Sequence, residues 1–491
     1  MSEGLSLSAA RGLALEVLAE LRQVPDLTYA DVRFVDEDRE LVRLRNGVLE
    51  AVTRRRTEGF GVRVLAAGGW GFASTSSMDA AAISVTAQRA LAIARASGRA
   101  SLAKAHWVEA TASRGTYRTP SATSPLEVPL DRKVADLLAA IAPLRAGDGP
   151  IRVAEARGDF GRTRKLLVST EGTDVEQDLV YTGAGIVAYA VGDDGQAQRR
   201  SYPTSVDGDL GQGGYERVAA MRLPDEAPRV RDEAISLLTA KPLPAGVRDV
   251  VLASDQMALQ IHESCGHPVE LDRALGTEIS LAGGSFLQPA MAGKLQYGSR
   301  IVNLTADATN PGGCGTFGFD DEGTPAKRVA LVREGTFVGW LSSRETAAEL
   351  GIEPSGAVRA ESHERIPLIR MVNINLEPGQ GSLQDLLADS DGAVLFESNK
   401  SWSIDDLRLH FQFGCEAAWE IRGGRKVELY RDAIYAGTTP KFWGACDAIA
   451  GREAWRLWGL GNCGKGEPMQ AMRVGHGSAP ARFRRVEVGH G

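Results

Sequence analysis

Residues 41–52, LVRLRNGVLEAV, place the pair Asn46-Gly47 between two short apolar-rich runs. An Asn-Gly pair in this position is the strongest short-range sequence signal for a β-hairpin. Just upstream, Val32 and Phe34 show the alternation of a strand. We therefore expect antiparallel strands over about residues 30–76, with the first tight turn at Asn46-Gly47.

The sequence that follows extends this hairpin into a sheet with helices. Residues 59–74 predict a second hairpin with Gly68-Gly69 at its tip, and residues 78–97 predict a long helix. A further helix is expected over residues 130–146, and the sequence from residue 151 to about residue 200 is strand-like. The first part of the chain is therefore expected to form a domain of sheet plus helices.

A domain boundary is expected where prolines cluster. Residues 223–252 combine a proline-flanked helical pattern with a second proline-rich stretch, a composition typical of such boundaries. We place an amino-terminal α+β domain at residues 1–222 and a linker region with a helix at residues 223–247. A carboxy-terminal domain then occupies residues 248–491.

The second half of the chain is glycine-rich and strand-like. Glu334-Gly335 and Gly423-Gly424 stand at the tips of two hairpin candidates, and helical patterns are fewer than in the first half. No internal repeat of fixed period is visible. The sequence therefore predicts an α+β protein of two unlike domains, the second rich in antiparallel sheet.

Composition excludes several classes of protein. The 491 residues carry 56 basic and 63 acidic side chains, a net charge of −7, and no long basic run, so nucleic-acid binding is not expected. Glu16 and Glu20 interrupt the apolar amino-terminal stretch, which favours an amphipathic helix over a signal peptide. No stretch approaches the roughly 20 apolar residues of a membrane span. The five cysteines lack CxxC spacing, which argues against a disulfide framework and favours the cytoplasm.

Residues 261–268, IHESCGHP, resemble a zinc-protease signature with one residue too many. Histidines four residues apart share one face of an α-helix, whereas His262 and His267 are five apart and would be separated by about 140°. Gly266 tolerates unusual backbone conformations, and Pro268 disfavours α geometry at the residue before it. Either the helix ends at Gly266 and His267 swings back, or a single π-type turn absorbs the extra residue.

A catalytic zinc site normally takes three protein ligands and leaves the fourth position for water. Glu263, beside the first histidine, is the expected general base of such a site. The motif supplies two ligands, so a third has to come from elsewhere in the chain. From the residues alone the candidates are Cys265, His363, His410, Cys463 and His476. Cys265 is expected to be a small buried thiol. Cys463 lies in a predicted glycine-flanked loop, where a metal ligand and a plain turn cysteine are equally expected.

Several stretches together resemble the TldD/PmbA family of metalloproteases, in its metal-binding TldD-like branch. They are EGFGVRV at 58–64, HESCGHPVE at 262–270, DDEGTP at 320–325, RIPLIRMVN at 365–373 and NCGKGEPMQ at 462–470. Their order and spacing run through nearly the whole chain.

The resemblance implies a zinc-dependent peptidase. His262, His267 and Cys463 would bind one zinc ion per catalytic chain, Glu263 would be the catalytic acid/base, and the carboxy-terminal domain would carry the site. The family further implies cytoplasmic dimers that degrade unfolded peptides or mature peptide precursors. The partner would be a PmbA-like (TldE) subunit without the metal motif, giving a heterodimer, or a second copy of this chain, giving a homodimer.

Two other functions remain open from the sequence. The first is a peptide-binding or assembly subunit in which a closed, four-ligand zinc site is structural. The second is a cysteine hydrolase that uses Cys265 with a histidine, although no orienting partner is evident.

Three further motifs have weaker functional interpretations. GGCGTFG at residues 312–318 contains GxGxxG but lacks the strand and helix of a dinucleotide site, so a glycine-rich loop that shifts on peptide binding is expected instead. The acidic run at residues 320–322 favours a hydrogen-bonded turn over a second metal site. An oxyanion-stabilising role for His363, Arg359 or Arg365 is weaker than a packing role.

Overall fold

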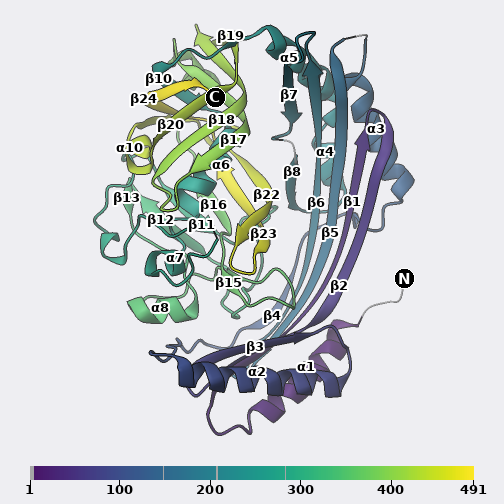
Figure 1. The fold of residues 1–491 in the computed structure, drawn as a ribbon, viewed down its shortest axis with the longest axis vertical. Helices are drawn as coiled ribbons and strands as arrows, with labels where there is room; N and C mark the ends of the chain where they lie inside the picture. Colours follow the sequence, from purple (N-terminus) through teal and green to yellow (C-terminus); the bar gives the residue numbers. More distant parts are fainter. Residues whose placement is uncertain (1–4, 148, 206–207, 282) are drawn as a thin grey trace.

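The computed structural model describes residues 5–147, 149–205, 208–281 and 283–491. A long, curved sheet from the first half of the chain stands beside a second, more compact body of sheets from the second half (Figure 1). Among the described residues the α-helices of the second half are not fewer than those of the first, contrary to the expectation from the sequence, but shorter, and both halves mix helices with strands. The predicted α+β class of two unlike halves is confirmed.

The long sheet has the strand order β3-β2-β1-β5-β6-β4, and β7 and β8 also pair with β6. Its pairings are antiparallel except for β4 with β6. The strands are β1 (Leu27–Arg45), β2 (Val48–Ala66), β3 (Gly69–Thr75), β4 (Arg114–Arg118), β5 (Ile151–Ser169), β6 (Asp174–Val191), β7 (Ala197–Tyr202) and β8 (Asp209–Gln212).

The predicted Asn46-Gly47 turn joins β1 to β2. Both residues have positive φ, 52° and 81°, as a two-residue type I′ turn requires, and Arg45 pairs directly with Val48. The second turn lies one residue earlier than expected, at Ala67-Gly68, because Ala66 pairs with Gly69. Turn chemistry therefore sets the register of the first three strands.

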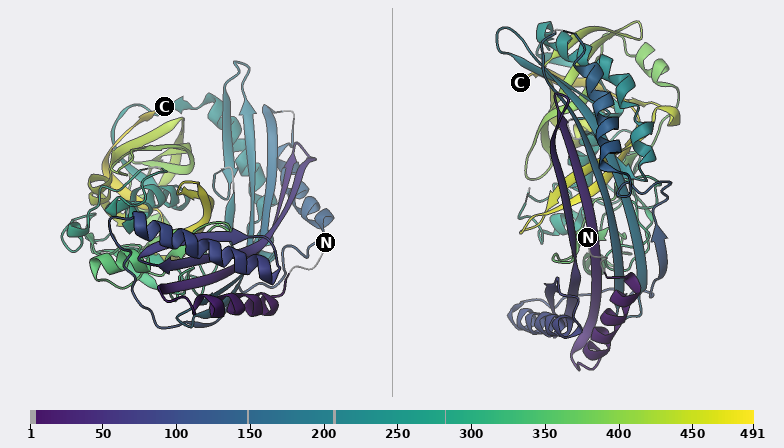
Figure 2. Two further views of the ribbon diagram at one scale, coloured as in Figure 1. Left: turned by 60° about the horizontal axis from the view of Figure 1, so that its bottom comes forward. Right: turned by 90° about the vertical axis from the view of Figure 1, so that its right-hand side faces the viewer.

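Helices cover the convex side of the long sheet in two separate groups (Figure 2). At one end, α1 (Leu7–Leu21) and α2 (Ala80–Ala100) pack on β1, β2 and β3 around a core that includes Phe34 and Phe60. At the other end, α3 (Leu130–Leu144) and α5 (Leu223–Thr239) pack on β5, β6 and β7, next to the short α4 (Glu216–Ala220). The opposite, concave side of the sheet faces the second half of the chain (Figure 1).

The second half contains two larger sheets. The first has the order β17-β10-β24-β20-β18-β19-β9, with β21 paired to β24, and the second has the order β13-β12-β11-β16-β23-β22. Most pairings are antiparallel, as predicted, but β10–β17, β19–β9 and β16–β23 are parallel. A separate pair is formed by β14 (Val358–Arg359) and β15 (Leu368–Ile369).

The strands of the first of these sheets are β9 (Lys241–Pro242), β10 (Gly246–Leu252), β17 (Val394–Ile404), β18 (His410–Arg422), β19 (Arg425–Arg431), β20 (Ala433–Thr438), β21 (Cys446–Ile449) and β24 (Ala481–His490). Those of the second are β11 (Leu304–Asp307), β12 (Arg328–Arg333), β13 (Thr336–Phe337), β16 (Asn373–Leu376), β22 (Arg456–Lys465) and β23 (Gln470–Ser478). The hairpin turns predicted at Glu334-Gly335 and Gly423-Gly424 are both present, each with two positive φ angles.

The helices of the second half are short. They are α6 (Ser254–Ile261), a π-helical turn (His262–Gly266), α7 (Leu271–Leu275), α8 (Arg344–Leu350), α9 (Leu383–Ala388), α10 (Thr439–Gly444) and 3₁₀ turns at Pro289–Met291 and Arg452–Ala454. Of the helices described here, in either half, none is both long and apolar enough to cross a membrane.

Buried ion pairs join the two halves. Arg63 of β2 contacts Glu322 at 3.0 Å, and Lys165 of β5 contacts Asp321 at 2.8 Å. Asp320, the first residue of the same acidic run, accepts backbone hydrogen bonds from Glu322, Thr324 and Val358. Residues 320–322 therefore form a buried, hydrogen-bonded turn that links the carboxy-terminal half to the long sheet.

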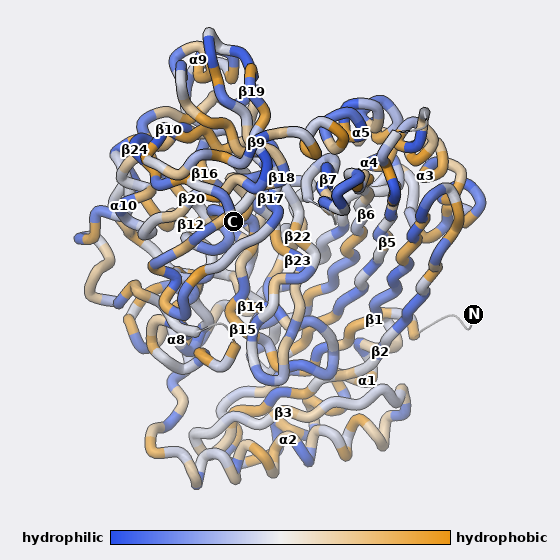
Figure 3. The backbone as a smooth tube through the Cα atoms, turned by 45° about the horizontal axis from the view of Figure 1, so that its top comes forward, coloured by the Kyte–Doolittle hydropathy of each residue, from blue (hydrophilic) through white to orange (hydrophobic). Residues whose placement is uncertain are grey.

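The hydropathy pattern matches this arrangement. Along β1, β5 and β6 hydrophilic and hydrophobic residues alternate (Figure 3), as expected for strands with one face on a core and the other toward a more polar space. The helix expected between the two halves is α5, which packs on the long sheet. The domain limits of 1–222, 223–247 and 248–491 stay a prediction.

Candidate metal centre

The IHESCGHP segment forms the end of α6 and a π-helical turn. Met257, Gln260 and Ile261 of α6 are fully buried, which fixes the helix against the sheets around it. The backbone N–H of His267 donates to the carbonyl of His262 at 3.2 Å, the i to i+5 bond of a π-turn. Of the two conformations considered for this segment, the π-type turn is therefore the one found.

This wider turn brings the two histidine side chains together. The ring centroids of His262 and His267 lie 4.8 Å apart, with the rings nearly perpendicular. Both side chains are buried, and burial lowers the pKa of each imidazole below its ordinary value. Neutral imidazole is the form that binds a metal ion.

A third histidine orients His262. The Nε2 atom of His476, on β23, lies 2.8 Å from Nδ1 of His262, so one ring donates a hydrogen bond to the other. With Nδ1 engaged, Nε2 is the nitrogen of His262 left for a metal ion. His476 was one of the candidates for the third ligand, and its contact gives it the position of a residue that supports a ligand.

Glu270 orients the second histidine. Its carboxylate contacts Nδ1 of His267 at 3.1 Å and Nε of Arg273 at 2.7 Å. Burial raises the pKa of Glu270, but the charges of Lys465 and Arg273 outweigh burial and hold this pKa well below its usual range. A carboxylate behind a histidine fixes the tautomer in which Nε2 is free to bind a metal.

Cys463 lies on β22, not in the loop that the flanking glycines suggested. Leu460 pairs with Val474 and Cys463 with Met472, so two residues of β22 oppose one of β23 between these pairs, which is a β-bulge. Buried Arg370 holds the strand by donating to the carbonyl of Cys463. The bulge and this bond aim the Cys463 side chain at the π-turn.

The three side chains converge on one point. The ligand atoms of His262, His267 and Cys463 all lie within 4.8 Å of one another, and Sγ of Cys463 is 3.9 Å from Nε2 of His267. Burial raises the pKa of the Cys463 thiol, but its interaction with His267 and the charge of Arg370 outweigh burial, so that this pKa falls below its ordinary value. Two imidazoles and a thiolate are a donor set that suits zinc. In the part of the chain that the structure describes, this is the one cluster of its kind.

Glu263 forms an ion pair with Arg408. Nη1 of Arg408 donates to its carboxylate at 2.7 Å, and both side chains are buried. Arg408 takes a positive φ of 65°, a conformation that non-glycine residues rarely adopt, and its carbonyl accepts a hydrogen bond from Thr439. A buried guanidinium in a constrained backbone therefore holds the carboxylate next to the first histidine.

The other residues considered from the sequence lie elsewhere. Burial raises the pKa of Cys265 to about 12, so this thiol stays protonated at neutral pH, which disfavours a cysteine hydrolase. His363 packs on the long sheet, where its Nε2 lies 3.2 Å from Oγ of Ser76. His410 is exposed at the start of β18. Arg365 accepts a hydrogen bond from Arg33 at its backbone carbonyl, and its backbone N–H donates to the carbonyl of Ser362.

The glycine-rich segment at residues 312–318 has a packing role. A Cβ atom added to Gly313 or Gly315 would collide with Asn373 or with the backbone of Val372. The loop thus lies directly against β16, and its glycines permit that close approach. A shift of this loop on peptide binding stays a prediction.

Sequence reasoning missed the roles of Arg408, Lys465 and Glu270. Arg408 and Lys465 are the clearest cases, because both are buried and one contacts Glu263 while the other donates to Asp272 at 2.8 Å. Lys465 follows Cys463 by two residues, and Glu270 follows His267 by three, so both stand inside the motifs already noted. Arg408 has no such signal in the sequence.

A cleft leads to the metal centre. It has a volume of about 420 Å³ and is lined by His262 and His476, by residues 458–462 of β22, and by Arg39 and Leu41 of β1. The centre therefore faces the space between the long sheet and the carboxy-terminal half.

Comparison with known sequences identifies the class of protein. Models of the PmbA/TldA metallopeptidase family match domain 1 at residues 30–94, the central domain at residues 123–241 and the C-terminal domain at residues 245–490. These matches cover more than half of the chain. The chain belongs to this metallopeptidase family.

Relatives and solved structures agree with that assignment. A metalloprotease of Methanothermobacter thermautotrophicus is 29% identical over 94% of this chain and 95% of its own length. A protein of Saccharolobus solfataricus named zinc metalloprotease TldD homolog is 25% identical over 50% of this chain and 52% of its own length. These names support a peptidase role and a metal.

Two solved structures share the fold. A proposed modulator of DNA gyrase from Thermotoga maritima has a TM-score of 0.75 at 17% identity, covering 98% of this chain and all of that one. TldE from Thermococcus kodakarensis has a TM-score of 0.73 at 14% identity, covering 98% and 99%. At these identities the likeness concerns the fold alone.

The π-turn is expected to depend on Gly266. A Cβ atom there would collide with the sulfur of buried Met371, so Gly266→Ala should lower the free energy of unfolding by about 1–3 kcal/mol and weaken zinc binding. Chemical denaturation and competition with a chelator measure the two effects. Gly444→Ala is the control, because its Cβ would enter open space. A Gly266→Ala protein with unchanged stability and unchanged zinc binding would show that the π-turn does not depend on Gly266.

Proposed function

We propose that the chain is a zinc-dependent peptidase that hydrolyses peptide bonds in unfolded or extended peptides, including peptide precursors that it would mature. The observation that carries the proposal is the convergence of His262, His267 and Cys463 beside a buried glutamate, at the end of a cleft. The metalloprotease names of the relatives support the same class of reaction.

The donor set fits one zinc ion per chain. His262 would bind through Nε2, because its Nδ1 contacts His476, and His267 would bind through the nitrogen that faces Cys463. Zinc held by two imidazoles and a thiolate lowers the pKa of a water molecule toward about 7 and polarises a carbonyl group. His476 and Glu270 keep the two imidazoles in the orientation and tautomer that binding requires.

Glu263 is proposed as the general acid/base. Its carboxylate accepts the proton of the attacking water and delivers that proton to the leaving amine. Arg408 holds the carboxylate at 2.7 Å and fixes its rotamer before substrate arrives. The cost of burying both charged groups is offset by their mutual contact.

The cleft suits an extended peptide. β22 is the last strand in its sheet and carries Cys463, and its residues 458–462 line the cleft. A peptide that adds a strand to this edge would be held by main-chain hydrogen bonds, which depend little on sequence. Such binding would place a peptide bond near the metal centre without selecting one side chain.

The alternative is a structural zinc site in a peptide-binding or assembly subunit. A structural site needs a fourth protein ligand. Cys265 is a poor candidate, because it does not belong to the cluster of converging ligand atoms and its sulfur lies 3.4 Å from the hydroxyl of Tyr297. His476 directs its Nε2 at His262. These contacts favour the open, three-ligand site.

The expected subunit arrangement is a dimer, either with a TldE-like chain or between two copies of this chain. The likeness in fold to TldE from Thermococcus kodakarensis supports this expectation. Light scattering on the purified chain, alone and mixed with a TldE-like chain from the same source, should give the mass of two subunits in at least one sample. The mass of a single chain in both would contradict the proposal.

Substitution of the site residues should separate metal binding from catalysis. His262→Ala, His267→Ala and Cys463→Ala are each expected to lose zinc and activity, because each removes one of three donor atoms. Glu263→Gln should keep zinc and lose about a hundredfold or more in kcat, the range of general acid–base catalysis. Elemental analysis and hydrolysis of an unstructured peptide measure the two properties.

Matched controls are available in the same chain. His410→Ala removes an exposed histidine, and Cys446→Ala removes a buried cysteine of β21, so both proteins should keep zinc and activity. A Cys463→Ala protein with its full zinc content would refute the ligand set. Full activity of zinc-loaded Glu263→Gln would refute the mechanism.

A further inference from the structure

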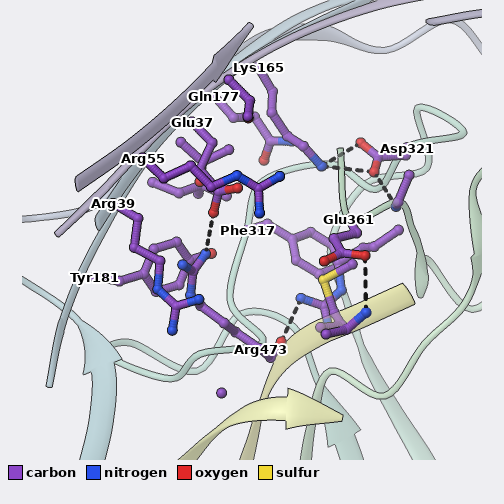
Figure 4. Close-up of a pocket in the computed structure, with 18 of the residues that line it drawn as sticks. Glu37, Arg39, Arg55, Lys165, Gln177, Tyr181, Phe317, Asp321, Glu361 and Arg473 are labelled. Atoms are coloured by element: carbon purple, nitrogen blue, oxygen red, sulfur yellow. Dashed lines mark hydrogen bonds and ion pairs between the residues drawn. The ribbon is translucent and has the colours of Figure 1, made fainter. Parts of the chain in front are cut away.

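A second cavity lies beside the metal-centre cleft. It has a volume of about 310 Å³ and is enclosed by β1, β2, β5 and β6 of the long sheet on one side (Figure 4). On the other side it is closed by β14, β23 and the loop that carries Phe317. Both halves of the chain therefore build it.

The lining of this cavity carries more positive than negative groups. Its cationic side chains are Arg39, Arg55, Lys165, Arg359 and Arg473, and its carboxylates are Glu37, Asp321 and Glu361. Each carboxylate is already engaged. Glu37 contacts Arg473 at 3.0 Å, Asp321 contacts Lys165 at 2.8 Å, and Glu361 accepts the backbone N–H of Ala471 at 3.1 Å. The excess charge of the cavity is thus positive.

Arg359 is the most unusual of these cations. It is only 6% exposed, and its guanidinium donates to the backbone carbonyls of Arg473 and Met371, with no carboxylate of the described chain in ion-pair contact. Its Nε atom is buried without a hydrogen-bond partner. The guanidinium lies 5.5 Å from the ring centre of Phe317. Burial lowers the pKa of Arg359 to about 10, which leaves it charged at neutral pH.

Arg55 supplies a second cation of the cavity lining. It is exposed on β2, and within the described residues no carboxylate pairs with it. Figure 4 shows its guanidinium turned toward the middle of the cavity, on the same side as Glu37. Arg39, by contrast, is engaged by both carboxylate oxygens of Asp159. The cavity therefore combines one buried guanidinium, Arg359, with one exposed guanidinium, Arg55.

This cavity adjoins the cleft at the metal centre. Arg39, Leu41, Gly461 and Ala471 line both spaces. Gly461 precedes Cys463 by two residues on β22, so the junction lies close to the proposed ligand. A peptide extended along the edge of β22 would pass from the metal centre into this cavity.

We propose that the cavity is a specificity subsite that binds a carboxylate of the peptide substrate, with Arg359 and Arg55 as its guanidinium donors. The proposal rests on the proposed peptidase function and narrows the substrate to peptides that place an anionic group a few residues from the cleaved bond. Guanidinium groups suit carboxylates because they offer paired N–H donors in a plane. The carboxylate is supplied by an Asp or Glu side chain or by the carboxyl terminus of the peptide.

Binding of labelled peptides to the zinc-loaded Glu263→Gln protein tests the subsite without hydrolysis. In a series of unstructured peptides, a single Glu is placed at successive positions. For each of these peptides a twin carries Gln at the same position. Every peptide is made in two forms, one with a free and one with an amidated carboxyl terminus. Fluorescence anisotropy gives the dissociation constants. We expect one carboxylate-bearing peptide to bind at least about tenfold more tightly than its neutral twin, as a charge-assisted hydrogen bond allows. Amidated Glu and Gln peptides report the side chain, and Gln peptides with and without amidation report the terminus.

Variants then assign the preference to the cavity. Arg55→Gln, at an exposed position, should bring the ratio of the two dissociation constants toward one, and Arg359→Lys should lower it as well. Arg89→Gln removes an exposed arginine of α2, remote from the cavity, and should leave the ratio unchanged. This control has the same change in net charge as Arg55→Gln.

The outcomes separate the subsite from the peptidase function. Equal binding of all charged and neutral twins overturns the subsite, as does a preference that survives both Arg55→Gln and Arg359→Lys. Hydrolysis by the wild-type protein together with equal binding leaves the peptidase proposal standing and removes the subsite. A preference that depends on Arg55, in a protein whose wild-type form cleaves no peptide, retains the subsite and removes the peptidase proposal.

Discussion

The i to i+5 hydrogen bond from the N–H of His267 to the carbonyl of His262 is the constraint on which the candidate site depends. In a regular α-helix the extra residue of IHESCGHP would turn the two imidazoles away from each other. The π-turn instead sets their rings 4.8 Å apart. π-turns are rare and occur frequently at functional sites, which agrees with the buried, metal-suited cluster formed here.

The surroundings hold this turn in place. His476 contacts the first imidazole, Glu270 contacts the second, and Arg370 fixes the strand that carries Cys463. These supporting residues come from three separate segments of the chain, so the site needs the assembled carboxy-terminal half. The ion pairs of Arg63 and Lys165 with the acidic turn then bring the long sheet over the cleft. The position of the substrate path is therefore a consequence of the contact between the two halves.

Local chemistry made part of this structure predictable from sequence. The turns at Asn46-Gly47, Glu334-Gly335 and Gly423-Gly424 follow from residues that accept positive φ, and they set the hairpins around them. The two possible geometries of IHESCGHP also followed from Gly266 and Pro268. Cys463 was assigned through family resemblance, because no local rule brings a residue nearly 200 positions away to the π-turn. Its strand position, created by a bulge, and the contact of Arg408 with Glu263 arise from tertiary packing and carry no local signal.

X-ray absorption spectroscopy at the zinc edge of the purified protein tests the central claim most directly. The proposed site predicts a four-coordinate ion with two nitrogen neighbours at about 2.0 Å, one sulfur at about 2.3 Å and one light oxygen neighbour that is not a protein ligand. The Cys463→Ala protein should give no zinc absorption edge, because it is expected to lose the ion. A shell with two sulfur atoms, or one with no sulfur in the wild-type protein, would contradict the site described here.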